Sequence, residues 1–141
     1  MNQPQLKVFI SHATVDTWVA RQMADHIHRC GHTTFLDQVN LSHGDDFEQE
    51  ILRQADESSE LLVLFTPWAL DRRYLWLEIG VFWGARKRIV GVLYGLTAKE
   101  LIADEKTPVA IKRLLLLEIN QIDSYFLQLQ NRSIQKESTN E

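Results

Sequence analysis

The sequence predicts an α/β fold in which a parallel β-sheet carries helices on both faces. Short, nearly continuous apolar segments alternate five times with stretches whose apolar residues recur at helical spacing. This alternation is typical of βαβ units, because a helix supplies the crossover that parallel strands require. The chain has 141 residues, of which 45% are hydrophobic. It therefore has the size of one domain and enough apolar surface for a buried core.

The expected strands are rich in β-branched and large apolar residues and contain few polar side chains, a pattern that favours burial on both faces of a sheet. They are Leu6–Ile10, Thr33–Leu36, Leu61–Phe65, Ile89–Leu93 and Leu115–Ile119.

The expected helices carry apolar residues three or four positions apart, so that each helix has one buried face. These stripes are Val15, Val19, Met23 and Ile27; Phe47, Ile51 and Ala55 with Leu52 beside them; Leu75, Ile79, Phe82 and Trp83; Leu101 and Ile102; and Ile122, Phe126 and Leu129.

Residues at the ends of these stripes agree with helix boundaries. Gly31 follows the first stripe. A helix commonly ends at a residue in the left-handed conformation, and glycine adopts that conformation at the lowest cost. Asp46, three residues before Gln49, is a suitable start for the second helix, and Thr97 with Glu100 has the form of a capping box. The polar segment 133–141 lacks periodicity. We therefore expect a domain over residues 1–132, followed by a flexible tail or the start of a linker.

Composition excludes several classes of function. The net charge is −4, so the chain lacks the basic footprint of a nucleic-acid-binding protein, and we expect no direct contact with nucleic acid. The run Arg86–Arg88 is interpreted as solvated surface. No apolar segment is long enough to span a membrane, and no leader sequence is visible. The single cysteine, Cys30, rules out an internal disulfide and fits a cytoplasmic location.

The loop after the first expected strand lacks the phosphate-binding motifs of common α/β families. It reads S-H-A-T-V-D, without the glycines of a dinucleotide-binding fingerprint or a P-loop. Flavodoxins need a glycine-rich loop, and phospho-receiver domains need carboxylates there. His26, His28, Cys30 and His32 have no second cluster to complete a zinc site, so we expect no bound metal.

Several short motifs, in order and spacing, resemble those of the TIR (Toll/interleukin-1 receptor) domain family in its bacterial form. Residues 8–16 are similar to the opening box, F-I-S-H followed by an acidic residue. Asp37 and residues 41–45 resemble the BB loop, in which a leucine and a glycine follow an aspartate. Tyr74 and Glu78 match the motif of the third helix, an aromatic residue four positions before a glutamate.

The resemblance covers about residues 6–130 and implies a flavodoxin-like, five-stranded parallel sheet. The sequence departs from the family pattern at two positions: Tyr74 stands where tryptophan is common, and Arg72 stands where a small polar residue is usual. The family includes enzymes that cleave NAD⁺ between nicotinamide and ribose. The resemblance therefore implies an NAD⁺ glycohydrolase or cyclase that needs no cofactor besides NAD⁺ as substrate.

Glu78 is the catalytic carboxylate that the resemblance implies, and Tyr74 is the ring that stacks on substrate. The alternative for Tyr74 is packing in the core. Residues four apart on a helix share a face, so the two side chains lie together. Nicotinamide leaves NAD⁺ as a neutral pyridine and needs no general acid. One carboxylate is therefore chemically sufficient, unlike in most glycosidases. The alternative is that Glu78 is a solvated helix residue or forms a structural ion pair with Arg72, Arg73 or Arg86.

Other candidates lie at the carboxyl ends of the strands, where open parallel sheets bind their ligands. Ser11 and His12 are expected to contact ribose or the nicotinamide amide, although Ser11 also suits a helix cap. Asp37 is either a ligand contact or a carboxylate that orders its loop. Arg73, like Arg72, suits a pyrophosphate by charge. Trp76 faces elsewhere and suits core packing or a subunit contact.

The resemblance also implies partners. Self-association, or binding to other TIR domains, is expected through the loop Asn40–Asp45, and a separate sensor or effector subunit is an option. The biological role that it implies is bacterial defence against phage. Two alternatives stay open: a non-catalytic TIR adaptor or virulence factor, and an enzyme like the nucleoside deoxyribosyltransferases, which would leave NAD⁺ intact.

Overall fold

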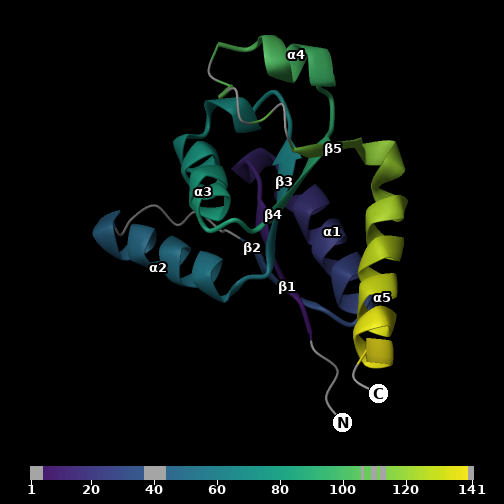
Figure 1. Cartoon of the computed structure of the whole chain (residues 1–141). Helices are drawn as coiled ribbons and strands as arrows, with labels where there is room; N and C mark the ends of the chain where they lie inside the picture. Colours follow the sequence, from purple (N-terminus) through teal and green to yellow (C-terminus); the bar gives the residue numbers. More distant parts are fainter. Residues whose placement is uncertain (1–4, 37–43, 106, 109–110, 112–113, 140–141) are drawn as a thin grey trace.

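The chain forms a five-stranded parallel sheet with the strand order β2-β1-β3-β4-β5 (Figure 1). The computed structural model describes residues 5–36, 44–105, 107–108, 111 and 114–139. The strands are β1 (Lys7–Ser11), β2 (Thr33–Leu36), β3 (Glu60–Phe65), β4 (Arg88–Leu93) and β5 (Leu115–Glu118). The predicted fold is confirmed, and the predicted strand bounds are correct to within one residue.

Helices cover both faces of the sheet (Figure 1). Ile51 of α2 and Phe82 of α3 pack in one apolar cluster, whereas Ile27 of α1 and Leu129 of α5 pack in the other. Both clusters draw on alternate residues of the same strands, which explains why the strand segments are apolar throughout. The helices are α1 (Thr17–Arg29), α2 (Gly44–Glu57), α3 (Arg73–Gly84), α4 (Ala98–Ala103) and α5 (Ile122–Thr139).

Some predicted apolar stripes include residues that the structure exposes. Val15 has 71% of its surface exposed, because residues Thr14–Asp16 form a 3₁₀ turn and α1 begins only at Thr17. The four-residue repeat therefore does not extend back to Val15. Three further members of the predicted stripes are also exposed: Leu52, Trp83 and Ile102.

Helix termini follow the local signals in the sequence, with one difference in α2. Gly31 has φ +90°, the left-handed conformation expected after α1, and Thr97 forms the predicted capping box with Glu100 at the start of α4. The second helix begins at Gly44, two residues before the predicted start at Asp46.

The C-terminal helix is longer than the composition predicts. Helix α5 continues to Thr139, so most of the segment expected to be a flexible tail is helical, and the domain boundary at residue 132 stays a prediction. The helix is fixed to the sheet by Glu60, which is fully buried. Its carboxylate accepts hydrogen bonds from Tyr125 at 2.5 Å and Arg132 at 2.6 Å. Burial, together with this carboxylate, raises the pKa of Tyr125 well above its usual value.

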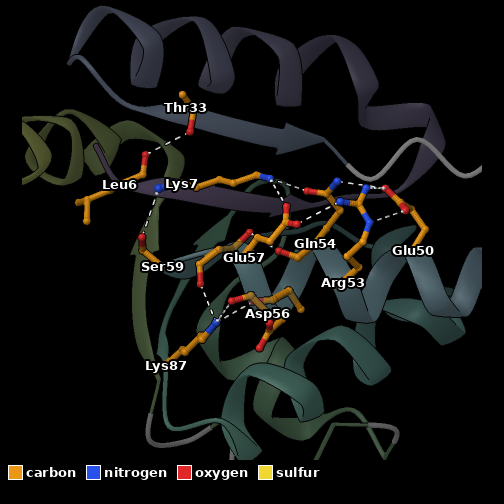
Figure 2. Close-up of polar contacts among 12 residues, drawn as sticks. Leu6, Lys7, Thr33, Glu50, Arg53, Gln54, Asp56, Glu57, Ser59 and Lys87 are labelled. Atoms are coloured by element: carbon orange, nitrogen blue, oxygen red, sulfur yellow. Dashed lines mark hydrogen bonds and ion pairs between the residues drawn. The ribbon is translucent and has the colours of Figure 1, made fainter. Parts of the chain in front are cut away.

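Helix α2 is attached to the sheet by two lysines (Figure 2). Lys7 of β1 donates to Gln54 at 2.6 Å and to Glu57 at 3.2 Å. Lys87 donates to the carbonyls of Ala55, Asp56 and Ser58, each at 2.8 Å. An ammonium at the carboxyl end of a helix offsets the helix dipole and satisfies carbonyls without helical partners. Lys87 is therefore a helix cap, which corrects the prediction that the run Arg86–Arg88 is merely solvated surface.

Arg86, next to Lys87, occupies a backbone conformation that favours glycine. Its φ is +59°, and it ends α3 with the hydrogen-bond pattern of a Schellman motif, in which Arg86 N–H donates to Trp83 and Lys87 N–H donates to Phe82. Any side chain with a Cβ is strained in this region.

Substitutions of Arg86 and of Lys87 are therefore expected to change the free energy of unfolding in opposite directions. Arg86→Gly is expected to raise the free energy of unfolding by about 0.5–1 kcal/mol, because it removes a Cβ from a left-handed residue. Lys87→Met is expected to lower it by about 1–3 kcal/mol, because the carbonyls at the end of α2 lose a charged donor. Urea unfolding of both variants measures this, and changes of the same sign would contradict these two roles.

Candidate active site

The candidate residues gather at the carboxyl edge of the sheet, around the point where the strand order reverses. Strand β1 pairs with both β2 and β3, so the chain leaves β1 and β3 toward opposite faces and opens a crevice at their ends. Ser11 ends β1, and Arg72 is the N-cap residue directly before α3. Thr66, directly after β3, donates to the Asp16 carboxylate at 2.6 Å. This bond joins the two loops that border the crevice.

Glu78 is at the centre of this region and is fully buried. Its Oε1 accepts a hydrogen bond from the Ser11 hydroxyl at 2.5 Å and an ion-paired hydrogen bond from Arg72 at 3.0 Å. The same guanidinium nitrogen of Arg72 lies 3.4 Å from the Ser11 hydroxyl. The three side chains therefore form one connected polar cluster between the end of β1 and the first turns of α3.

The position of Glu78 follows from the helical period. Leu75, Ile79 and Phe82 face the core, and position 78 lies on the same side of α3 as these residues. The sequence predicts that Glu78 is beside this stripe, whereas the structure places it inside the stripe. A carboxylate there requires hydrogen-bonding partners, because burial of an unpaired charge is costly.

Arg72 supplies one of these partners. Glu78 is therefore both the residue predicted to be catalytic and a member of the predicted ion pair. Arg72 has an extended backbone, with φ −89° and ψ 113°, which turns it out of the helical register. Its side chain is only 11% exposed and reaches Glu78 from outside the helix. Arg72 is thus the more exposed member of the ion pair, since the Glu78 side chain is fully buried.

A pocket of about 450 Å³ has Arg72 in its lining. Its volume is within the range of small-molecule sites. Tyr74 and Arg73, two of the predicted contacts, line it. The full set comes from the loop after β1 and from the segment between β3 and α3: Ala13, Thr14, Val15, Trp68, Asp71, Arg72, Arg73 and Tyr74.

The predicted site residues are thus partly brought together. Tyr74 and Arg73 are at the pocket, and Ser11 contacts Glu78. His12 is buried beside them, and its Nε2 lies 3.4 Å from the Thr17 hydroxyl. Among the described residues, the pocket lining does not include Glu78, the ion-pair partner of Arg72.

The second loop of the predicted site is described only at its end. Asp37, and residues 40–43 of the loop Asn40–Asp45, lie outside the described residues, while Gly44 and Asp45 are in the first turn of α2. The predicted roles of Asp37 and of this loop stay predictions.

Trp68 is a site residue that the sequence analysis missed. It is 60% exposed and lines the pocket from the loop after β3. A tryptophan directly after a buried strand, at the ligand edge of the sheet, is a usable signal. Trp76, by contrast, packs against Phe65 and donates to the Leu70 carbonyl at 3.2 Å. The predicted core role of Trp76 is confirmed.

The histidines near Cys30 each have a separate structural partner. His28 contacts the Thr34 hydroxyl at 2.9 Å, and His26 stacks on Phe126. His32 accepts from the Leu6 amide through Nδ1, so its Nε2 carries the proton and donates to the Leu129 carbonyl at 3.0 Å. Within the described ranges, no three His, Cys, Asp or Glu side chains group as they would around a metal. The same part of the chain contains no helix long and apolar enough to cross a bilayer.

Comparison with known proteins identifies the family of this domain. The TIR domain family model matches residues 8–129. A protein of Brachypodium distachyon named as a probable 2′ cyclic ADP-D-ribose synthase is 29% identical over 102 residues, which are 71% of this chain and 46% of that protein. This chain therefore spans less than half of that relative's length.

Two solved structures share the fold. The TIR domain of the Toll-related receptor TRR-2 from Hydra magnipapillata has a TM-score of 0.63 at 19% identity, covering 91% of this chain and 97% of that chain. The CMP N-glycosidase BcmB from Clostridium botulinum has a TM-score of 0.55 at 16% identity, covering 87% of this chain and 97% of that chain.

The ion pair between Arg72 and Glu78 is testable through its effect on stability. Arg72→Ala is expected to lower the free energy of unfolding by about 3 kcal/mol, because it takes a cation away from a buried carboxylate. In the double variant with Glu78→Gln the loss is expected to be smaller than the sum of the single losses by at least about 1 kcal/mol. Urea unfolding of the four proteins measures the coupling. Additive losses would contradict the pair.

Proposed function

This chain belongs to the TIR domain family, and we propose that it is an enzyme that cleaves the bond between nicotinamide and ribose in NAD⁺. The observation that carries the proposal is Glu78, a carboxylate buried at the carboxyl edge of the sheet. Its ion-pair partner Arg72 lines a pocket of about 450 Å³. The named activity of the plant relative, a cyclic ADP-ribose synthase, supports the same reaction class.

The proposed reaction needs only the groups that the site contains. The C1′–N bond breaks, and its electron pair moves to the ring nitrogen, so nicotinamide leaves without charge. Positive charge then develops on C1′ and the ribose oxygen. A carboxylate at the position of Glu78 stabilises that charge, most strongly in a site that excludes water. The Ser11 hydroxyl, at 2.5 Å from Oε1, holds the carboxylate in place.

The intermediate has two fates. When water adds to C1′ and loses a proton, the product is ADP-ribose. When a hydroxyl of the ADP-ribosyl group adds instead and loses its proton, the product is cyclic. The name of the plant relative favours the second outcome, and exclusion of water from the site by the bound substrate would favour it as well.

Arg72 determines whether Glu78 is available. In this structure the guanidinium pairs with Oε1 at 3.0 Å, and we infer that this pair has to open before the carboxylate can face the substrate. A pyrophosphate in the pocket offers Arg72 a doubly charged, bidentate acceptor. We infer that the pyrophosphate draws Arg72 away from Glu78, so that substrate binding uncovers the catalytic group. Arg73, exposed at the pocket, is the second cation for the same anion.

We also propose that self-association of the domain switches the activity on. The loop Asn40–Asp45 precedes and enters α2, and self-association through it would hold the opened state. The biological role that we propose is defence against phage, through depletion of NAD⁺ or through a cyclic signal. A separate sensor or effector subunit that controls the domain is part of this proposal.

Nicotinamide release tests the activity. At high protein concentration, with and without a crowding agent, the wild type is expected to convert NAD⁺ to nicotinamide and ADP-ribose or a cyclic product, resolved by liquid chromatography. Glu78→Gln is expected to lose at least about 100-fold in rate, because it removes the charge that faces the transition state. Asp25→Asn, an exposed carboxylate of α1, is the matched control and is expected to retain full activity.

Thermal unfolding of Glu78→Gln separates a catalytic loss from a loss of fold. Equal rates in the wild type and Glu78→Gln would contradict the assignment of Glu78. If the wild type releases no nicotinamide while a sizing column shows assembly, the enzyme proposal fails, and the non-catalytic TIR adaptor becomes the better account.

A further inference from the structure

A second pocket, of about 610 Å³, adjoins the first at the same edge of the sheet. It is lined by Val15, Asp16 and Val19 at the start of α1, by Trp68, and by Tyr94 and Gly95 after β4. Val15 and Trp68 line both pockets. The two pockets therefore adjoin at these two residues and are treated together as one elongated site.

The second pocket presents two aromatic rings to solvent. Trp68 is 60% exposed and Tyr94 is 44% exposed. Their backbones are nevertheless fixed. The Tyr94 amide donates to the Phe65 carbonyl at 2.9 Å, and the Ala69 amide donates to the Thr66 carbonyl at 3.1 Å. Exposed rings on a well-anchored backbone offer flat apolar surfaces on which a planar ligand can stack at low entropic cost.

Charge divides the elongated site into two different parts. The first pocket has the cations Arg72 and Arg73 in its lining. Among the described residues, the only charged side chain that lines the second is Asp16, which is 6% exposed and is held by Thr66 at 2.6 Å. A carboxylate repels phosphate and accepts from amine or hydroxyl groups. The first part is therefore suited to phosphates, and the second to an uncharged group that is planar and donates hydrogen bonds.

We propose that the second pocket binds the adenosine half of the dinucleotide, with the adenine ring against Trp68 and Tyr94 and its amine or ribose hydroxyls toward Asp16. The pyrophosphate then lies at Arg73, and the nicotinamide ribose lies toward Glu78. This deepens the proposed function, since the identity of the dinucleotide rests on it. Recognition of an adenine nucleotide by Trp68 and Tyr94 is, however, testable without any reaction.

Calorimetric titration with adenosine monophosphate is the test. The wild type is expected to bind it, and Tyr94→Ala and Trp68→Ala are each expected to weaken binding about 10-fold, because one stacked base contributes about 1–3 kcal/mol. Trp68→Phe, which keeps a ring, is expected to retain most of the affinity. Trp18→Ala is the matched control, since Trp18 is 71% exposed and lines neither pocket.

Nicotinamide mononucleotide serves as the second probe. Tyr94 lines only the second pocket, so Tyr94→Ala is expected to weaken binding of adenosine monophosphate and to leave that of nicotinamide mononucleotide unchanged. In turnover, the same variant is expected to raise KM for NAD⁺ about 10-fold with kcat unchanged. Equal loss of both probes, or no loss of either, would overturn the assignment.

The two proposals fail in different ways. If the protein binds adenosine monophosphate through Tyr94 but releases no nicotinamide, the adenosine site stands and the NAD⁺-cleaving activity falls. If it cleaves NAD⁺ but Trp68→Ala and Tyr94→Ala bind adenosine monophosphate as the wild type does, the activity stands and the adenosine site is wrong. Absence of binding by the wild type at millimolar concentration also overturns the adenosine site.

Discussion

The carboxylate of Glu78 is buried inside the apolar face of α3, and the organisation of the carboxyl edge of the sheet depends on how its charge is balanced. Ser11 at the end of β1 and Arg72 at the start of α3 both bond to the same carboxylate oxygen. A strand, a loop and a helix are thereby fixed to one another through a single charged group. Because removal of any partner from a buried charge is costly, this cluster constrains the fold and the chemistry together.

The same cluster links stability to function. A carboxylate that is paired with an arginine is well placed but unavailable, and a substrate that carries a pyrophosphate competes for that arginine. The ion pair therefore keeps Arg72 on Glu78 until a bound anion or an assembled neighbour compensates for the energy that is lost when the pair separates. The departure from the family pattern at position 72, an arginine in place of a small polar residue, acquires a physical role in this account. It makes the resting state closed.

The sequence was sufficient for the fold, because buried parallel strands and amphipathic helices have different apolar periods. The same periodicity placed Glu78 next to Leu75 and Ile79. It did not decide which of Arg72, Arg73 and Arg86 pairs with Glu78, because Arg72 has an extended backbone and lies outside the helical period. The exposure of Val15 and the capping role of Lys87 were missed for a similar reason, since a 3₁₀ turn and a contact between helix α2 and residue 87 leave no local pattern. The pocket proposed to bind adenosine combines three loops that only the folded chain brings together.

The most direct test of this account is a structure of the wild-type protein with a carbocyclic NAD⁺ analogue, which binds as NAD⁺ does but lacks the ribose oxygen needed for cleavage. The account predicts that Arg72 leaves Glu78 and contacts the pyrophosphate, that the nicotinamide-bearing carbon faces the Glu78 carboxylate, and that adenine lies against Trp68 and Tyr94. A bound analogue with the bond between Arg72 and Glu78 intact, and with its reactive carbon remote from Glu78, would contradict it.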